Sequence, residues 1–254
     1  MLFSMWETDE LPSNFRAWLG QYDRILVPCD HNRELFGRYH PDVKVVPLGV
    51  DHSVWFPGDN PSGPFKFVAG GSLWMRKGLD IVVEAFRKAE IPGAELHIKA
   101  APHAQDTPKQ GFGDRVFLHR EWMSAEETVA FYRSAHCVIA PARGEGWGLM
   151  PLQAIAAGIP TILSDTSGQS EFKDVATLVV PTVKQKSNTV GYWDQASVDD
   201  VAEAMREIHR DWVFYREVAL GMVTKSKKYS WQKASQKLVR ALPADRKRTR
   251  LNSS

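Results

Sequence analysis

Two segments of the sequence combine closely spaced glycines with charged side chains, and both could bind a phosphorylated ligand. In CVIAPARGEGWGLMPLQAIAAGIP, residues 137–160, glycines at positions 144, 146 and 148 precede a helix that is expected to begin near Pro151. Glycines let backbone amides approach a ligand closely, and the free N–H groups at a helix start attract anions. The pattern predicts a phosphate site in which Glu145 accepts hydrogen bonds from ligand hydroxyls. The alternative for Glu145 is an exposed acid beside the helix dipole.

The second segment is FKFVAGGSLWMRKGLDIVVEAF, residues 65–86, where Arg76 and Lys77 stand just before a predicted helix. Two cations beside a helix start could hold a diphosphate, with Lys77 acting as a point charge and Arg76 as a planar fork. The alternative is that both are solvated loop residues. Neither segment carries a familiar nucleotide signature, because GxxxxGK[ST] is absent and GEGWG lacks the spacing of a dinucleotide fingerprint.

Both loops need a rigid frame, and the rest of the sequence predicts a doubly wound α/β fold with a Rossmann-like parallel sheet. Short apolar runs alternate with helical patterns, which is typical of βαβ units. Ser124 and Glu127 form a predicted capping box, and Ser197 and Ser230 are expected to cap two further helices. The glycine loops follow strands, at the carboxyl ends where open α/β sheets bind ligands. We expect strands at residues 25–28, 43–47, 65–70, 94–100, 116–119, 137–141, 160–164 and 177–181.

The chain is expected to divide unequally at a Gly- and Pro-rich linker, residues 48–64. Residues 65–243 suffice for a complete doubly wound domain, whereas residues 1–47 suffice only for a strand–helix–strand unit that must pack on something else. The remaining predictions concern irregular segments: long loops at residues 101–114 and 182–196 and a disordered basic tail at residues 244–254.

Composition limits the class of protein. With 43% apolar and 24% charged residues, the chain has the composition of an ordinary soluble globular protein. The net charge of +2 arises from the basic tail, so nucleic-acid binding is not expected. No apolar run is long enough for a transmembrane segment, and the acidic start MLFSMWETDELP does not fit a signal peptide, so we expect a cytoplasmic protein. Cys29 and Cys137 are expected to be buried free thiols.

The segment GEGWGLMPLQAIAAGIPTI, residues 144–162, resembles the donor-site signature of the family 4 glycosyltransferases, which have the GT-B fold. Four further segments resemble that family in the expected order, and together the five span residues 43–242. They are VKVVPLGVDHSVWFP at the interdomain junction, GGSLWMRKGLDIVVEAF at the diphosphate-binding loop, FLHREWMSAEETVAFYRSAHCVIAP around the base, and YSWQKASQKLVRAL in the closing helix.

The resemblance implies that the carboxyl-terminal Rossmann-like domain binds a nucleotide-sugar donor, linked to UDP, GDP or ADP, and that transfer retains the anomeric configuration. Lys77 and Arg76 would then neutralise the departing diphosphate, and Glu145 would lie beside the hydroxyls of the donor sugar. The implied donor-binding residues are Gly71 and Ser72 in the diphosphate loop, Glu121 and Trp122 beside the base, and Gly146, Trp147, Gly148, Leu149 and Gln153 around the sugar, phosphate and ribose.

Two positions depart from the family pattern. Gln153 stands where the second acid of the Glu-x7-Glu motif belongs, and because glutamine still hydrogen-bonds ribose hydroxyls, we expect altered donor preference rather than lost binding. Ser72 replaces an arginine of many members, whose charge Arg76 is expected to supply. The sequence has no Asp-x-Asp and no histidine pair at zinc spacing, so neither a metal nor a cofactor is expected.

The resemblance therefore predicts a metal-independent, retaining glycosyltransferase of the hexosyltransferase type. Residues 1–47 resemble only the last elements of the acceptor domain, so the chain is expected to transfer poorly alone, to a saccharide, lipid or other acceptor that the sequence leaves open. Apolar surface on residues 1–47 would favour self-association or a partner chain. Two alternatives stay open: a non-catalytic nucleotide-sugar-binding module that needs a partner, and a nucleotide-binding Rossmann protein of another class, against which the absence of GxGxxG argues.

Overall fold

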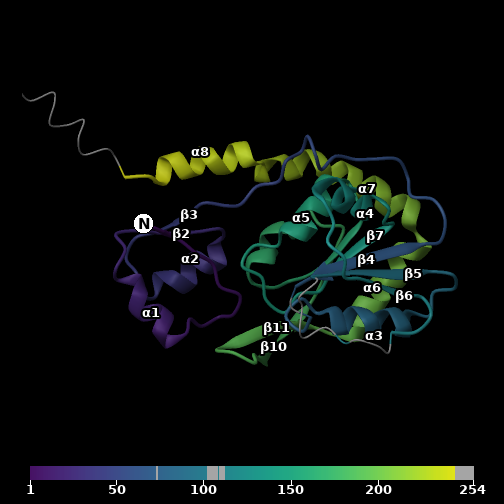
Figure 1. Cartoon of the computed structure of the whole chain (residues 1–254), viewed down its shortest axis with the longest axis horizontal. Helices are drawn as coiled ribbons and strands as arrows, with labels where there is room; N and C mark the ends of the chain where they lie inside the picture. Colours follow the sequence, from purple (N-terminus) through teal and green to yellow (C-terminus); the bar gives the residue numbers. More distant parts are fainter. Residues whose placement is uncertain (73, 102–107, 109–111, 244–254) are drawn as a thin grey trace, which may run out of the picture.

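The computed structural model describes residues 1–72, 74–101, 108 and 112–243, and its larger unit is built on a six-stranded sheet. All neighbouring strands in this sheet are parallel, in the order β6-β5-β4-β7-β8-β9. Figure 1 labels β4 to β7 of this sheet. Every strand predicted for this unit is confirmed. The strands are β4 (Lys66–Gly71), β5 (Glu95–Ala100), β6 (Val116–His119), β7 (Cys137–Ala140), β8 (Thr161–Ser164) and β9 (Leu178–Val180).

Helices cover both faces of this sheet, which explains why its central strands β4, β7 and β8 are buried on both sides. On one face, α3 (Leu79–Ala89) and α6 (Val198–Arg210) bury their apolar sides against the sheet. The opposite face carries α4 (Ala125–Arg133), α5 (Leu149–Ala156) and α7 (Trp212–Ser226). The predicted doubly wound α/β fold is therefore confirmed. The strand order reverses between β4 and β7, so the loops that follow these two neighbours open at the same edge, where such sheets bind ligands.

The predicted helix starts are also confirmed. The hydroxyl of Ser124 accepts a hydrogen bond from the Glu127 amide at 3.1 Å, and the Glu127 carboxylate accepts one from the Ser124 amide at 2.7 Å, which completes the capping box. The hydroxyls of Ser197 and Ser230 cap α6 and α8 (Trp231–Ala241). Helix α5 begins at Leu149, two residues before the expected Pro151.

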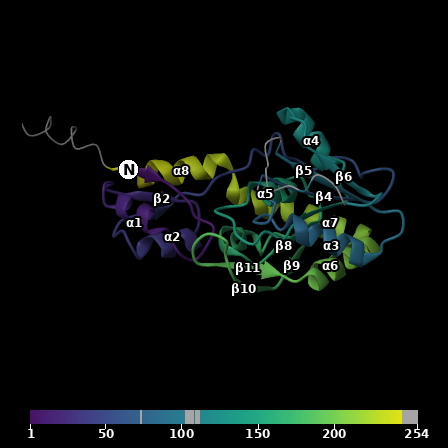
Figure 2. The ribbon, with the colours of Figure 1, turned by 60° about the horizontal axis from the view of Figure 1, so that its bottom comes forward.

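The smaller unit holds a three-stranded parallel sheet, in the order β1-β2-β3. Its strands are β1 (Leu2–Phe3), β2 (Ile25–Val27) and β3 (Val43–Val45), and its helices are α1 (Ser13–Leu19) and α2 (Asp30–Gly37). Helix α8 leaves the larger unit and runs along this small sheet, as Figures 1 and 2 show. Ala241 at its end is buried with Leu26 and Val46, so the last helix fastens the two units together.

The prediction of an unstructured loop at residues 182–196 is wrong, because this segment forms an antiparallel hairpin. Strand β10 (Thr182–Lys186) pairs with β11 (Tyr192–Ala196), and Gly191 in the turn has a φ of +74°, which favours glycine. Strand β10 was not predicted because its sequence, TVKQK, is mostly polar, whereas the other strands were recognised as apolar runs. At its tip the hairpin meets the small unit, where the Tyr192 amide donates to the Asp9 carboxylate at 2.7 Å.

Short 3-10 helices complete the described part of the chain, η1 (Ser167–Phe172) after β8 and η2 (Lys227–Tyr229) before α8. The predicted tail at residues 244–254, and most of the predicted loop at 101–114, lie outside the described residues. No helix among the described residues combines the length and apolarity needed to span a membrane.

Candidate functional site

A cluster of three charged side chains, here called the charged cluster, forms where the loops after β4 and β7 meet. It consists of Arg76, Lys77 and Glu145. The Lys77 ammonium is ion-paired with the Glu145 carboxylate, and Nη1 of Arg76 lies 3.6 Å from the other carboxylate oxygen. Nη1 of Arg76 also donates to the Gly144 carbonyl at 2.9 Å. The three residues that the sequence singled out for catalysis are therefore neighbours, with 10 to 19% of their side-chain surface exposed.

The backbone around Glu145 is fixed by the start of η1. The Glu145 amide donates to Oγ of Ser167 at 2.8 Å, and the Gly168 amide donates to the Glu145 carbonyl at 2.8 Å. Position 168 must be glycine, because a Cβ there would lie 2.4 Å from the Gly146 carbonyl oxygen. Ser167 and Gly168 therefore hold the loop that carries Glu145.

Arg143 is a residue of the site that the sequence analysis missed. Its buried guanidinium forms a fork with the Asp80 carboxylate, with two N–O distances of 2.7 Å, and its Nε donates to the Gln195 side chain at 2.8 Å. It also donates to the Met75 carbonyl, next to Arg76. Arg143 thereby joins the loop after β7 to α3, to the cation-bearing segment and to β11, so it positions both sides of the charged cluster.

The glycines predicted for ligand contact also make room for protein atoms. A Cβ at Gly71 would lie 2.3 Å from the Lys77 side chain, so this glycine lets the lysine cross the end of β4. A Cβ at Gly144 would lie 2.3 Å from the Glu7 carbonyl oxygen, and one at Gly146 would lie 2.5 Å from the Met5 sulfur. The small unit thus lies directly against the glycine loop.

The loop ends in a left-handed glycine that begins α5. Gly148 has a φ of +100°, which ordinary side chains rarely adopt. Trp147 just before it is 2% exposed and packs edge-on against Phe172 and Tyr229. Its side chain belongs to the core, and only its backbone remains for a ligand. Leu149 is 38% exposed at the start of α5, and Gln153, one turn further on, is half-buried.

The residues predicted to surround a base lie two strands away from β4, beyond β6. Trp122 is 83% exposed, and the Glu121 carbonyl accepts a hydrogen bond from Nζ of Lys99 at 3.2 Å. Hydrogen bonds from its own backbone amide and from His119 lower the pKa of the Glu121 carboxyl, so this acid is ionised at neutral pH. Ser72 is exposed after β4. The contacts described for Glu121 are to β5 and β6, outside the charged cluster.

The small unit contributes a second acid, which the sequence analysis did not select. Oε1 of Glu7 lies 3.7 Å from Nη1 of Arg76. The preceding residue is held by Asn32, a fully buried amide that accepts from the Trp6 backbone at 2.6 Å and donates to the Gly146 carbonyl at 3.2 Å. Burial raises the pKa of the nearby Cys29 thiol to about 11, so the thiol stays protonated and donates to the same carbonyl.

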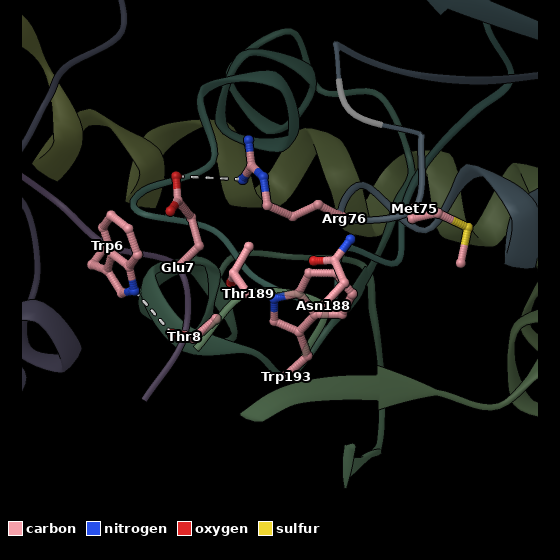
Figure 3. Close-up of a pocket in the computed structure, with 8 residues that line it drawn as sticks. All are labelled: Trp6, Glu7, Thr8, Met75, Arg76, Asn188, Thr189 and Trp193. Atoms are coloured by element: carbon pink, nitrogen blue, oxygen red, sulfur yellow. Dashed lines mark hydrogen bonds and ion pairs between the residues drawn. The ribbon is translucent and has the colours of Figure 1, made fainter. Parts of the chain in front are cut away.

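A cavity of about 340 Å³ lies beside Arg76, between the small unit and the hairpin (Figure 3). The small unit lines it with Trp6, Glu7 and Thr8, and the segment after β4 adds Met75 and Arg76. The hairpin completes the wall with Asn188, Thr189 and Trp193.

In the ranges that the structure describes, no group of three histidine, cysteine or acidic residues could hold a metal ion.

Most of the chain matches the model of one protein family. Residues 30–238 match a family model described as "Family 4 Glycosyltransferase in conflict systems". A D-inositol 3-phosphate glycosyltransferase of Arthrobacter sp. (strain FB24) is 28% identical over 54% of this chain and 38% of its own length. A glycogen synthase of Mycobacterium tuberculosis is 27% identical over 61% of this chain and 41% of its own. The chain thus matches about two fifths of the length of these relatives.

Solved structures agree on the fold. A sucrose-phosphate synthase from Thermosynechococcus elongatus superposes with a TM-score of 0.72 at 18% identity, over 94% of this chain and 61% of the other. At this identity the likeness is one of architecture, and it covers the small unit as well as the large one.

Proposed function

The chain belongs to family 4 of the glycosyltransferases, and from this premise we propose that it binds a nucleotide-diphosphate sugar and transfers the sugar to an acceptor hydroxyl with retention of configuration. The observation that carries the proposal is the charged cluster. Its two cations and its acid come from loops at the switch point of the sheet, beside the start of α5.

The cluster has the charges that the reaction needs. When the bond between the anomeric carbon and the phosphate oxygen breaks, the bonding electrons leave with the diphosphate, on which negative charge grows. The oxygen of the acceptor hydroxyl bonds to the same carbon, and its proton passes to the departing phosphate oxygen. Lys77 and Arg76 would stabilise that negative charge, and prepositioned charges of this kind lower the barrier to departure. Because the protein supplies two cations there, we propose that the reaction proceeds without a metal ion.

The ion pair between Lys77 and Glu145 supports a role in donor binding. In the absence of a donor, each charge compensates the other at a site that is largely buried. A diphosphate would draw the ammonium away, because it carries more negative charge than one carboxylate. Glu145 would then be released to accept hydrogen bonds from the sugar hydroxyls, while Ser167 and Gly168 keep its backbone in place.

The base, the ribose and the rest of the donor would extend from this cluster along the edge of the sheet. Gln153 on α5 is proposed to contact the ribose, and Glu121 and Trp122 to border the base, with Gly71, Ser72 and the amides of residues 146–149 around the phosphates and sugar. The names of the relatives, a glycogen synthase and an inositol phosphate glycosyltransferase, support a hexose as the transferred group.

The proposal is tested by following UDP-, GDP- and ADP-glucose with the purified chain by NMR, in buffer that contains EDTA. We expect slow hydrolysis of one donor, release of glucose first as the anomer present in the donor, and no effect of EDTA. Glu145→Gln should slow this hydrolysis, and Glu34→Gln, an exposed acid on α2, serves as the matched control. Release of the opposite anomer, dependence on added metal, or binding of no donor would contradict the proposal.

A further inference from the structure

We infer that the nucleotide-sugar donor carries guanine as its base, and that the carboxylate of Glu121 selects this base. The inference rests on the proposed function, because it names the base of the donor that the charged cluster is proposed to hold. It is carried by two exposed side chains that follow β6, Glu121 and Trp122, and by the groups that hold Glu121 in place.

The two side chains lie at a distance from the charged cluster that suits a nucleoside diphosphate. Lys77 crosses the end of β4, and Glu121 follows the end of β6, two strands away in the same parallel sheet. Neighbouring strands lie about 4.8 Å apart, so these two strand ends are separated by roughly 10 Å. A diphosphate at Lys77 would therefore place its ribose near the end of β5 and its base near Glu121.

The edge of the sheet is exposed on this side of the charged cluster and covered on the other. Beyond β7, strand β8 is followed by η1, in which Ser167, Gly168 and Gln169 are buried. In contrast, the side chain of Glu121 is 62% exposed and Trp122 is 83% exposed. A base that extends from the cluster thus meets exposed side chains beyond β6 and packed protein beyond β8.

The Glu121 carboxylate is held in a way that leaves part of it free for a ligand. Its Oε1 lies 3.3 Å from Nδ1 of His119, whose other ring nitrogen lies 3.0 Å from Nδ1 of His97. The Glu121 carbonyl accepts a hydrogen bond from Nζ of Lys99 at 3.2 Å, which ties its backbone to β5. A carboxylate has about four lone-pair sites. Because His119 and the Glu121 amide occupy only part of them, the carboxylate can accept further hydrogen bonds.

Guanine is the base whose edge matches an ionised carboxylate. Its N1–H and its N2 amino group are adjacent donors, and parallel N–H···O bonds to a carboxylate form a charge-assisted fork. Uracil offers one N–H between two carbonyl oxygens, and adenine offers its amino group beside an unprotonated ring nitrogen. Each of these would turn a lone pair toward the carboxylate, which a site built for the fork rejects. The Lys99 ammonium has further N–H groups near Glu121, which suit the O6 oxygen of guanine.

Trp122 offers a surface that every base can use. An exposed indole stacks on the face of a base, and this contact tolerates any base because each has a π face. The two side chains therefore have separable roles. Trp122 contributes affinity for all nucleotides, whereas Glu121 determines the choice among them.

The test is calorimetric titration of the full chain with GDP, ADP, UDP and IDP, whose base lacks only the amino group of guanine. We expect GDP to bind at least thirtyfold more tightly than ADP or UDP. It should bind at least tenfold more tightly than IDP, because a hydrogen bond to a charged group contributes a factor of about 10 to 100 in affinity.

Two variants separate selection from stacking. Glu121→Gln replaces one acceptor oxygen by an amino group, so GDP should bind about thirtyfold more weakly, while the affinities for ADP and UDP change less than threefold. Trp122→Ala should weaken all four ligands about tenfold and leave their ratios unchanged. Glu84→Gln, at an exposed position of α3, and Trp18→Ala, on α1, are the matched controls and should bind like the wild type. Circular dichroism checks the folding of each variant.

The outcomes distinguish this inference from the proposed function. If ADP, UDP or IDP binds as tightly as GDP, or if Glu121→Gln keeps the preference for GDP, the assignment of the base is wrong and the proposed function stands. If the wild type binds none of the four, both are wrong. If Glu121→Gln loses the preference for GDP but the wild type hydrolyses neither GDP-glucose nor GDP-mannose, the base assignment stands and the proposed transfer is wrong.

Discussion

The loop of residues 141–148 and the segment of residues 4–8 both bring an acid to Arg76, but the protein holds them in different ways. Glu145, on the loop, is fixed through its own backbone by η1, and Arg143 ties the loop to α3 and the hairpin. Glu7 belongs to the small unit, in the segment that follows β1, and Asn32 links this segment to the loop. The difference indicates that the position of Glu145 is set within the large unit, whereas that of Glu7 depends on the contact between the two units.

The largest change, in the free energy of unfolding, is expected when the 141–148 loop loses the ion pair that holds it. Asp80→Asn would leave the buried guanidinium of Arg143 without its carboxylate, and loss of one partner of a buried ion pair costs about 3 kcal/mol of unfolding free energy. Urea unfolding measures this loss. Asp199→Asn, which removes an exposed ion pair with Lys88, is the matched control and should cost less than about 1 kcal/mol. Equal losses in the two variants would show that Arg143 does not hold the loop.

The second prediction distinguishes the affinity for the sugar of the donor from the affinity for its nucleoside diphosphate. Glu145→Gln should weaken binding of the intact donor about thirtyfold, because charged hydrogen bonds to the sugar hydroxyls contribute about 1.5–3 kcal/mol. Binding of the nucleoside diphosphate alone should not weaken, since Lys77 loses its competing carboxylate. Calorimetry with both ligands measures the two affinities. If both ligands lose affinity equally, Glu145 does not contact the sugar.

A smaller loss of stability is expected when the hydrogen bonds between the small unit and the 141–148 loop are removed. Asn32→Leu would remove the acceptor of the Trp6 amide and one of two donors to the Gly146 carbonyl, at a cost of about 1–2 kcal/mol. Chemical unfolding measures the change, and Asn14→Leu on the exposed side of α1 is the control. If Asn32→Leu were as stable as the wild type, other contacts would hold residues 4–8.

The smallest effect concerns Glu7 itself. Glu7→Gln should tighten nucleoside diphosphate binding two- to threefold, because Arg76 then loses one of its two acids. The change is small because the pair is 3.7 Å apart and partly exposed, and such pairs contribute about 0.2–1 kcal/mol. Calorimetric titration with the nucleoside diphosphate measures this change in affinity, as it does for Glu145→Gln. Weaker diphosphate binding would place Glu7 in the donor site, alongside Glu145, and remove the distinction between the two acids.

The sequence predicts best the features that depend on neighbouring residues. The central strands that it predicts, β4, β7 and β8, are buried on both faces, and the capping box of Ser124 and Glu127 is a contact over three positions. Arg76, Lys77 and Glu145 could be selected because each lies beside a glycine loop at a strand end. These three side chains lie close together because the strand order places β4 next to β7.

The features that the sequence did not reveal depend on distant contacts or on polar strands. Glu7 lies close to Arg76 because the small unit packs against the loops of the large one. The ion-pair partner of Arg143 is Asp80, 63 residues away in the chain. The β10–β11 hairpin carries charged and amide side chains on its exposed surface, so it lacks the apolar signal of the other strands. Trp193 on this hairpin is buried and also lines the cavity.

The central claim is that the charged cluster binds the diphosphate of a nucleotide sugar, and calorimetric titration of Lys77→Ala tests it most directly. The wild type and the variant are titrated with UDP-, GDP- and ADP-glucose, and Lys88→Ala, an exposed lysine on α3, serves as the control. We predict that the wild type binds one of these donors, that Lys77→Ala weakens its binding at least tenfold, and that Lys88→Ala leaves it unchanged. Equal affinity of Lys77→Ala and the wild type would contradict the claim.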